Sequence, residues 1–271
     1  MKTSVIISTY NQPTWLEKSL WGYLQQTHSD FTILIADDGS GPETKNIIEK
    51  FSSNTNIKTQ HIWHEDNGFQ KSAILNKAIL AADADYLIFT DGDCIPRTDF
   101  IETHVNLAAK KQILSGGYCK LPLELSKQIT KDDITSQRAF DTQWLTKQGK
   151  ISSSSKRKIG LKNPLNKLAD KLTTTKATWN GCNASTWKEH ILAVNGHNEE
   201  MHYGGQDREM GQRLINLGLK SKQIRHQAVL LHLDHKRGYR TKESIDKNLA
   251  IRALTKTSGS TWTDSGIKKK S

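Results

Sequence analysis

Two aspartates separated by one glycine follow a short, mostly apolar run in the first third of the chain. The run Tyr86–Thr90 is typical of a buried strand, and Asp91-Gly92-Asp93 comes directly after it. The carboxyl end of a parallel strand is where α/β proteins bind ligands, and paired carboxylates suit Mg²⁺ or Mn²⁺. Gly92 lets a ligand approach the backbone closely. Taken alone, such a triplet is more often a plain acidic turn, so the rest of the chain has to decide.

Two earlier turns carry polar side chains in the same kind of place. The predicted strand Ser4–Ser8 ends in Thr9-Tyr10-Asn11, and the predicted strand Phe31–Ala36 ends in Asp37-Asp38-Gly39-Ser40. Because carboxyl ends of parallel strands share one edge of a sheet, these turns are expected beside the aspartate pair. The structural alternative for Asp38 is a helix cap.

The second half of the chain adds further candidates. Tyr203-Gly204-Gly205-Gln206-Asp207 opens a predicted helix, and the predicted strand Ala228–Leu231 leads into His232. The stretch Trp179–Trp187, small and polar, indicates a strand close to a ligand. Asp207 alone is explained as a first-turn helix acid and His232 alone as a structural histidine. Their joint occurrence at strand ends and at a glycine-rich turn favours one shared site.

Strand and helix patterns alternate with short connections, which predicts an α/β fold with a mostly parallel, doubly wound sheet flanked by helices. No G-x-G-x-x-G follows the first strand, so dinucleotide binding is a poor fit. From Leu123 to Thr178 the pattern weakens. Lys147 to Lys176 holds nine basic residues and one acid, which suits a mobile basic loop or a short surface helix.

The chain is strongly basic, with 39 Lys and Arg against 28 Asp and Glu and a formal charge of +11. This charge fits anionic phosphate ligands, nucleic acid or an anionic membrane surface, and does not choose between them. The three cysteines are too scattered for a zinc site or a disulfide framework. We expect no signal peptide and no membrane span, hence a cytoplasmic protein whose membrane contact is peripheral.

Together these stretches resemble the family 2 glycosyltransferases with the GT-A fold and its Rossmann-like sheet. The amino-terminal motifs of that resemblance are Ser8-Thr9-Tyr10-Asn11, Asp37-Asp38-Gly39-Ser40, Asn67-Gly68 with Asn76-Lys77-Ala78, and Asp91-Gly92-Asp93. The later motifs are similar to the carboxyl-terminal domain of galactosyltransferases: Asn195-Gly196-His197-Asn198-Glu199, Tyr203-Gly204-Gly205-Gln206-Asp207 and His232. Tyr203 stands where that pattern has Trp, and Gln206 where it has Glu.

The resemblance implies an inverting, metal-dependent transfer of a hexose or N-acetylhexosamine from a UDP-sugar to a glycan hydroxyl, in lipopolysaccharide or capsule synthesis. It implies a divalent cation, Mn²⁺ or Mg²⁺, and Asp207 as the catalytic base. The metal ligands would be Asp93, His232 and Asp91. The nucleotide-sugar residues would be Thr9, Tyr10, Asn11, Asp38, Lys71, Asp91 and Gly92. The acceptor residues would be Tyr203, Gly205, Gln206 and Asn183.

The same resemblance divides the chain into four parts. These are a nucleotide-sugar-binding half (1–120), a basic variable insertion (121–178), an acceptor-binding and catalytic half (179–240), and a carboxyl-terminal helix with a basic tail (241–271). The expected partners are the UDP-sugar and a glycan or lipid-linked glycan acceptor. From their charge, the basic segment Lys147–Lys176 and Lys268–Lys270 are expected to contact anionic lipid at the inner face of the cell membrane; the alternative is that the segment is a plain solvated loop.

Three other classes of protein stay open at this point. A nucleotidyltransferase uses a similar acidic pair, but Ser8–Pro13 lacks the usual glycine- and arginine-rich phosphate loop. A nucleic-acid-binding protein would explain the charge, yet no nucleic-acid motif is present, so we expect no nucleic-acid partner. A non-catalytic carbohydrate-binding relative would keep the fold and lose the acids, which are present.

Overall fold

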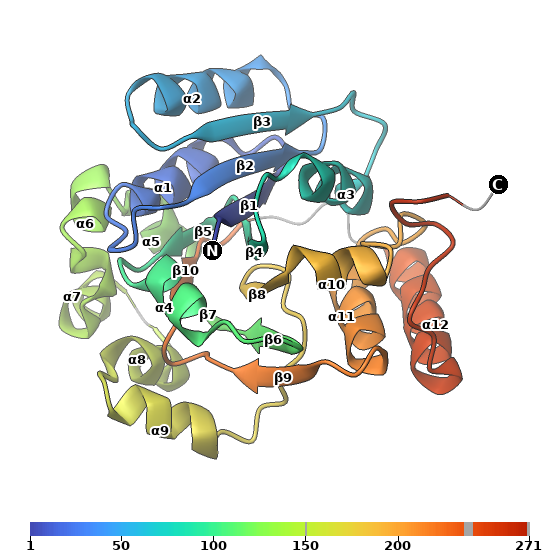
Figure 1. Cartoon of the computed structure of the whole chain (residues 1–271). Helices are drawn as coiled ribbons and strands as arrows, with labels where there is room; N and C mark the ends of the chain where they lie inside the picture. The colour runs from blue at the N-terminus through green and yellow to red at the C-terminus, as the bar shows by residue number, and fades with distance from the viewer. Residues whose placement is uncertain (150, 236–240, 270–271) are drawn as a thin grey trace.

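The computed structural model describes residues 1–149, 151–235 and 241–269, and its centre is a seven-stranded sheet (Figure 1). Four neighbouring strands are parallel: β3 (Thr59–Trp63), β2 (Thr32–Asp37), β1 (Thr3–Thr9) and β4 (Tyr86–Asp91). The sheet continues with β8 (Ala184–Trp187), β6 (Gln112–Ser115) and β9 (Lys220–Gln223). Only β8 runs antiparallel to its neighbours. The predicted mostly parallel α/β sheet is confirmed.

Helices cover both faces of this sheet, because alternate residues of a buried strand point to opposite sides. Val5 and Ile7 of β1 belong to one apolar core and Ile6 to the other. The first core is completed by helices α1 (Pro13–Tyr23), α2 (Pro42–Ser53) and α4 (Phe100–Leu107). The second is completed by α3 (Lys71–Ala81), α10 (Lys188–Ala193) and α11 (Gln206–Asn216).

A second sheet, of three strands, brings Asp93 close to His232, although the two residues are far apart in the sequence. Its strands are β5 (Cys94–Pro96), β10 (Val229–His232) and β7 (Gly117–Lys120). His232 pairs with Cys94 in the antiparallel register, so its side chain lies beside the residue that follows Asp93. β6 and β7 follow each other in the chain but belong to different sheets. The chain leaves the large sheet at Gly116, where a Cβ atom would lie 2.1 Å from the amide of Asn183.

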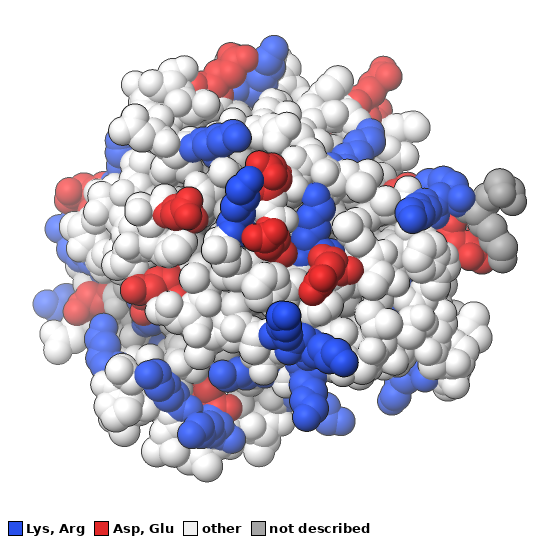
Figure 2. Space-filling view, in the orientation of Figure 1, with Lys and Arg blue, Asp and Glu red and all other residues white. Residues whose placement is uncertain are grey.

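The segment between β7 and β8 is helical rather than a mobile loop. It contains α5 (Leu123–Gln128), α6 (Lys131–Thr135), a 3-10 turn (Arg138–Phe140), α7 (Thr142–Gln148), α8 (Ser153–Gly160) and α9 (Leu165–Leu172). Scattered apolar residues, among them Leu125, Ile134 and Leu145, bury themselves in a third core with β10. Lys150 lies outside the described residues. Figure 2 shows Lys and Arg gathered at the lower left, where Figure 1 places α8 and α9.

The last helix, α12 (Lys242–Ser258), packs against α11. Beyond it Asn195 holds the chain, because the Asn195 side chain bonds the backbones of Thr263 and Lys268. Lys270, part of the predicted basic end, lies outside the described residues. Within the residues that the structure describes, no helix is long and apolar enough to cross a membrane.

Candidate active site

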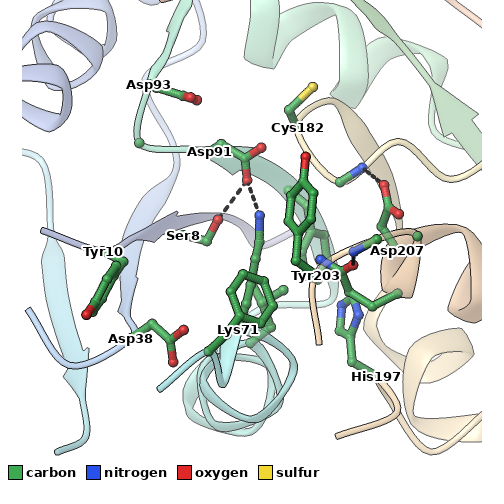
Figure 3. A pocket seen from close by; sticks show the side chains of 18 of the residues that line it. Ser8, Tyr10, Asp38, Lys71, Asp91, Asp93, Cys182, His197, Tyr203 and Asp207 are labelled. Carbon is green, nitrogen blue, oxygen red and sulfur yellow. Dashed lines mark hydrogen bonds and ion pairs between the residues drawn. The ribbon is translucent and has the colours of Figure 1, made fainter. Parts of the chain in front are cut away.

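A cavity of about 1000 Å³ lies at the carboxyl ends of β1, β2 and β4 (Figure 3). It is closed on the other side by the residues that open α11 and by α12. The predicted site residues that line it are Thr9, Tyr10, Asn11, Asp38, Lys71, Asp91, Gly92, Asp93, Tyr203, Gly205, Gln206, Asp207 and His232. The structure thus gathers both halves of the predicted site around one cavity.

The turn after β1 and the turn after β2 are hydrogen-bonded to each other. The backbone N–H of Asn11 donates to the hydroxyl of Ser40 at 2.8 Å, and the side-chain oxygen of Asn11 accepts from Gly41 at 3.0 Å. Tyr10 donates its hydroxyl to Asp66 at 2.8 Å while its ring stays 41% exposed at the cavity. These bonds fix the shape of the two turns and leave the side chain of Tyr10 accessible at the cavity.

Asp38 is the buried acid of this rim. One carboxylate oxygen lies 2.8 Å from Nε2 of His64, and the other accepts from the backbone N–H of Gln70 at 3.0 Å. Burial raises the pKa of Asp38, although the bonds to His64 and Gln70 and the charge of Lys71 oppose the rise. Its carboxylate therefore joins the loop before α3 to the turn after β2.

The first acid of the pair, Asp91, is held by a lysine and a serine. Its Oδ1 accepts from Nζ of Lys71 at 2.6 Å and from the hydroxyl of Ser8 at 2.7 Å. Burial alone lowers the pKa of Lys71, but Asp91, with smaller effects of Asp207 and Asp93, raises it well above its usual value. Lys71 is thus a fixed cation in the middle of the cavity.

The second acid, Asp93, faces two imidazole rings. Its Oδ2 lies 3.6 Å from Nε2 of His232 and 2.8 Å from Nε2 of His235. Burial by itself raises the pKa of Asp93, but the hydrogen bond from His235 and the charges of both rings bring it to about 2. Asp93 is therefore a carboxylate throughout the physiological range.

His232 is oriented as a metal ligand would be. Its Nδ1 lies 2.8 Å from the carbonyl oxygen of Leu233, which can only accept, so Nδ1 carries the hydrogen. In the neutral form of the ring, which is the form that binds a metal, the lone pair of Nε2 then faces Asp93. Ligand atoms of Asp93, Cys94 and His232 lie within 4.8 Å of one another. Burial raises the pKa of the Cys94 thiol far above its usual value, so the donors that fit a hard cation are the carboxylates and the imidazole.

Asp207 lies on the opposite side of the cavity from Tyr10 and Asp38 (Figure 3). Gly205 precedes α11 in a left-handed conformation (φ 93°), which turns the chain so that Asp207 opens the first helical turn. One carboxylate oxygen of Asp207 accepts from the backbone N–H of Gly181 at 3.1 Å. The opposite oxygen accepts from the N–H of Arg208. The carboxylate is thereby fixed at the cavity wall.

One predicted acceptor residue is not in the cavity. Asn183 is fully buried, and its amide holds β7, β10 and α4 together. It donates to Gly117 O at 2.8 Å and to Ala228 O at 3.1 Å, and its oxygen lies 3.0 Å from Nε2 of His104. Asn183 is therefore a structural residue, and this prediction is wrong.

Several cavity residues escaped the sequence analysis. His235 stands three residues after His232, so the H-x-x-H spacing could have revealed it. His197 lines the cavity although it is 1% exposed, and neither ring nitrogen has a partner among the described residues. Helix α12 contributes three further cavity residues, Ile245, Leu249 and Arg252. The position of α12 beside α11 depends on tertiary packing, which cannot be predicted from a local sequence pattern.

This sheet, with paired acids and a histidine at its ligand-binding edge, defines a GT-A glycosyltransferase. Residues 4–145 match the model of glycosyl transferase family 2, more than half of the chain, which therefore belongs to that family. Residues 167–236 match a second model, described as the N-terminal domain of galactosyltransferase. The predicted family is confirmed, and the enzyme class with it.

Curated relatives are glycan-synthesising enzymes or named glycosyltransferases. Chondroitin synthase of Escherichia coli is 25% identical over 261 residues, which cover 93% of this chain and 38% of that protein. The uncharacterized glycosyltransferase YfnE of Bacillus subtilis is 27% identical over 92% of this chain and 69% of its own length. This chain thus spans little more than a third of the chondroitin synthase.

Solved structures share the fold at low identity. TarS of S. aureus superposes with a TM-score of 0.61 at 15% identity, covering 94% of this chain and 39% of TarS. A mannosyltransferase of Pyrobaculum calidifontis, solved with GDP-Man and Mn²⁺, gives 0.59 at 16% identity over 94% of this chain and 61% of its own. A shorter TarS form, residues 1–349, solved with UDP, gives 0.54 at 14% identity over 94% of this chain and 65% of its own.

Proposed function

We propose that this protein transfers a hexose or N-acetylhexosamine from a UDP-sugar to a hydroxyl of a glycan acceptor, with inversion and with a divalent cation. The observation that carries the proposal is the arrangement of one cavity: Asp91 and Asp93 lie at one wall and Asp207 at another (Figure 3). His232 also lines this cavity, with Nε2 3.6 Å from Oδ2 of Asp93. Chondroitin synthase, a relative, makes a glycan, which supports a glycan acceptor. Lipopolysaccharide or capsule synthesis is the context proposed.

The donor would lie along the carboxyl ends of β1, β2 and β4. Tyr10 offers a ring for the base to stack on, and Asp38 a hydrogen-bond acceptor for the base or the ribose. Asp93, His232 and Asp91 would hold the cation, which acts as a Lewis acid on the diphosphate leaving group. Lys71 adds a second positive charge beside the same leaving group. The mannosyltransferase solved with GDP-Man and Mn²⁺ supports a metal-bound nucleotide donor.

Asp207 would act as the general base. The acceptor oxygen attacks the anomeric carbon as the bond from that carbon to the diphosphate breaks, and the hydroxyl proton passes to the Asp207 carboxylate. Attack from the side opposite the leaving group inverts the anomeric centre. Tyr203, Gly205 and Gln206 line the cavity around Asp207, so the acceptor sugar would lie against them.

Calorimetry tests the donor half of this proposal. UDP should bind in the presence of Mn²⁺, EDTA should abolish the binding, and GDP under the same conditions should bind more weakly. Incubation with a panel of nucleotide sugars should then release UDP only when metal is present. Binding that is equal with and without metal contradicts the proposal. Tighter binding of GDP than of UDP would mean that the donor is a GDP-sugar and not a UDP-sugar.

A further inference from the structure

Helix α9 presents a row of leucines to solvent. Leu165, Leu168 and Leu172 are 58%, 51% and 72% exposed and stand at positions i, i+3 and i+7, which share one face of a helix. An exposed apolar row of this kind on a helix of eight residues is unusual for a surface that meets only water.

The opposite face of α9 is fixed to the body of the protein. Asp170 is buried, and its Oδ1 accepts from the backbone N–H of His226 at 3.0 Å. The other oxygen accepts from the side chain of Gln227 at 2.8 Å, and Asn166 is buried one turn earlier. These anchors prevent the helix from rolling its leucines inward, so the row is a permanent surface feature.

Basic residues surround the leucine row. Lys162, Lys167, Lys171 and Lys176 are all exposed, and no ion pair holds any of them among the described parts of the chain. The one acid of the segment from Lys147 to Lys176 is Asp170, which is buried on the inner face. The outward face therefore combines exposed leucines with lysines that no ion pair holds among the described residues.

This combination decides between the possible partners. In a two-fold contact between copies, the same patch would face itself and bring lysines against lysines. Nucleic acid would neutralise the lysines and leave the leucines without an apolar environment. The surface of an anionic bilayer suits both kinds of side chain, because its headgroups attract the lysines and the leucines can bury themselves at the boundary of the acyl chains.

We propose that α9 binds the protein to anionic lipid, with Leu165, Leu168 and Leu172 in the interface and the flanking lysines among the headgroups. The segment after α9 runs within seven residues to Trp179, which lines the cavity. The inference does not depend on the chemistry proposed for the cavity.

Flotation of the full chain with lipid vesicles tests the inference. The protein should float with vesicles that contain phosphatidylglycerol, and high salt or pure phosphatidylcholine should reduce the bound fraction. Leu168→Gln and Leu172→Gln should each lower the partition coefficient on the order of tenfold. Lys167→Gln and Lys171→Gln should each lower it roughly fivefold at low salt.

Matched variants elsewhere on the surface serve as controls. Leu80, 55% exposed on α3, is changed to Gln, and Lys45 and Lys50 of α2 are changed to Gln. These variants should float like the parent, and circular dichroism should show that every variant is folded. Equal flotation of the α9 leucine variants and the parent overturns the proposal. A parent protein that does not bind vesicles also overturns it. If the parent then self-associates and Leu172→Gln abolishes that self-association, the leucine row binds a second copy of the chain instead.

Discussion

The ammonium group of Lys71 lies 2.6 Å from Oδ1 of Asp91, the same oxygen that accepts the hydroxyl of Ser8. The two acids of the pair thus have different partners, because Asp93 faces the imidazoles of His232 and His235. We infer that Asp93 and His232 would contribute most to holding the cation, and that Asp91, the third proposed ligand, also positions Lys71 toward the diphosphate.

Lys71→Met keeps the length of the side chain and removes its charge. Loss of one charge-assisted hydrogen bond to the diphosphate should weaken UDP binding roughly 10- to 100-fold. Calorimetry at saturating Mn²⁺ measures the effect. Lys45→Met on α2, an exposed lysine remote from the cavity, is the matched control. An unchanged affinity would place the diphosphate away from Lys71.

Asp93→Ala should abolish the part of UDP binding that depends on metal. The residual affinity should be the same with Mn²⁺ and with EDTA, because the main carboxylate ligand is gone. His235→Gln keeps a donor near Asp93 and should reduce metal affinity far less. If Asp93→Ala binds UDP and Mn²⁺ like the parent, Asp91-Gly92-Asp93 is only a turn.

Asp207→Asn separates binding from chemistry. The amide cannot take a proton, so sugar transfer should fall roughly 10²- to 10⁴-fold while UDP affinity stays nearly unchanged. Nearby acids are poor substitutes: Glu209 is buried in a bidentate pair with Arg213, and Asp234 pairs with Lys120 at 3.0 Å. Transfer at the parental rate would show that the base lies elsewhere.

His197 should make the fold sensitive to acid. Burial, with the charges of Arg213 and Lys71, lowers its pKa to about 3, whereas an unfolded histidine titrates near 6.5. Between these values the unfolded chain binds more protons, so stability falls as the pH falls. The free energy of unfolding should drop by about 2 kcal/mol from this group between about pH 7.5 and about pH 5.

His197→Phe tests that account. The variant removes two buried nitrogens that have no partner among the described residues, so it should be more stable than the parent at neutral pH by ~1 kcal/mol or more. It should also lose less stability in acid. Urea unfolding at both pH values measures these effects. Lower stability of His197→Phe at neutral pH would mean that a bound water or ligand satisfies the ring.

The parallel half of the sheet and its turns could be predicted from the sequence, because their signals are local. An apolar run followed by Asp91-Gly92-Asp93 specifies a strand and its polar end within a dozen residues. The contribution of α12 could not be predicted, since it depends on packing against a helix far away in the chain. Asn183 was predicted to bind the acceptor because it is polar and close in sequence to cavity residues. Its side chain instead bonds the backbones of Gly117 and Ala228 and so holds neighbouring segments together.

The anchoring of the chain by Asn195 bears on the order in which the protein can fold during synthesis. Asn195 is bonded to residues 263–268, and the neighbouring His197 backbone is held by Asn76 of α3. The wall that carries His197 is thus assembled from segments made at very different times. Strands β1 to β4 can pair as soon as β4 emerges from the ribosome, whereas this wall has to wait for residues 263–268. Ribosome-bound intermediates would therefore display half a cavity, with Asp91 and Asp93 in place and the opposite wall missing.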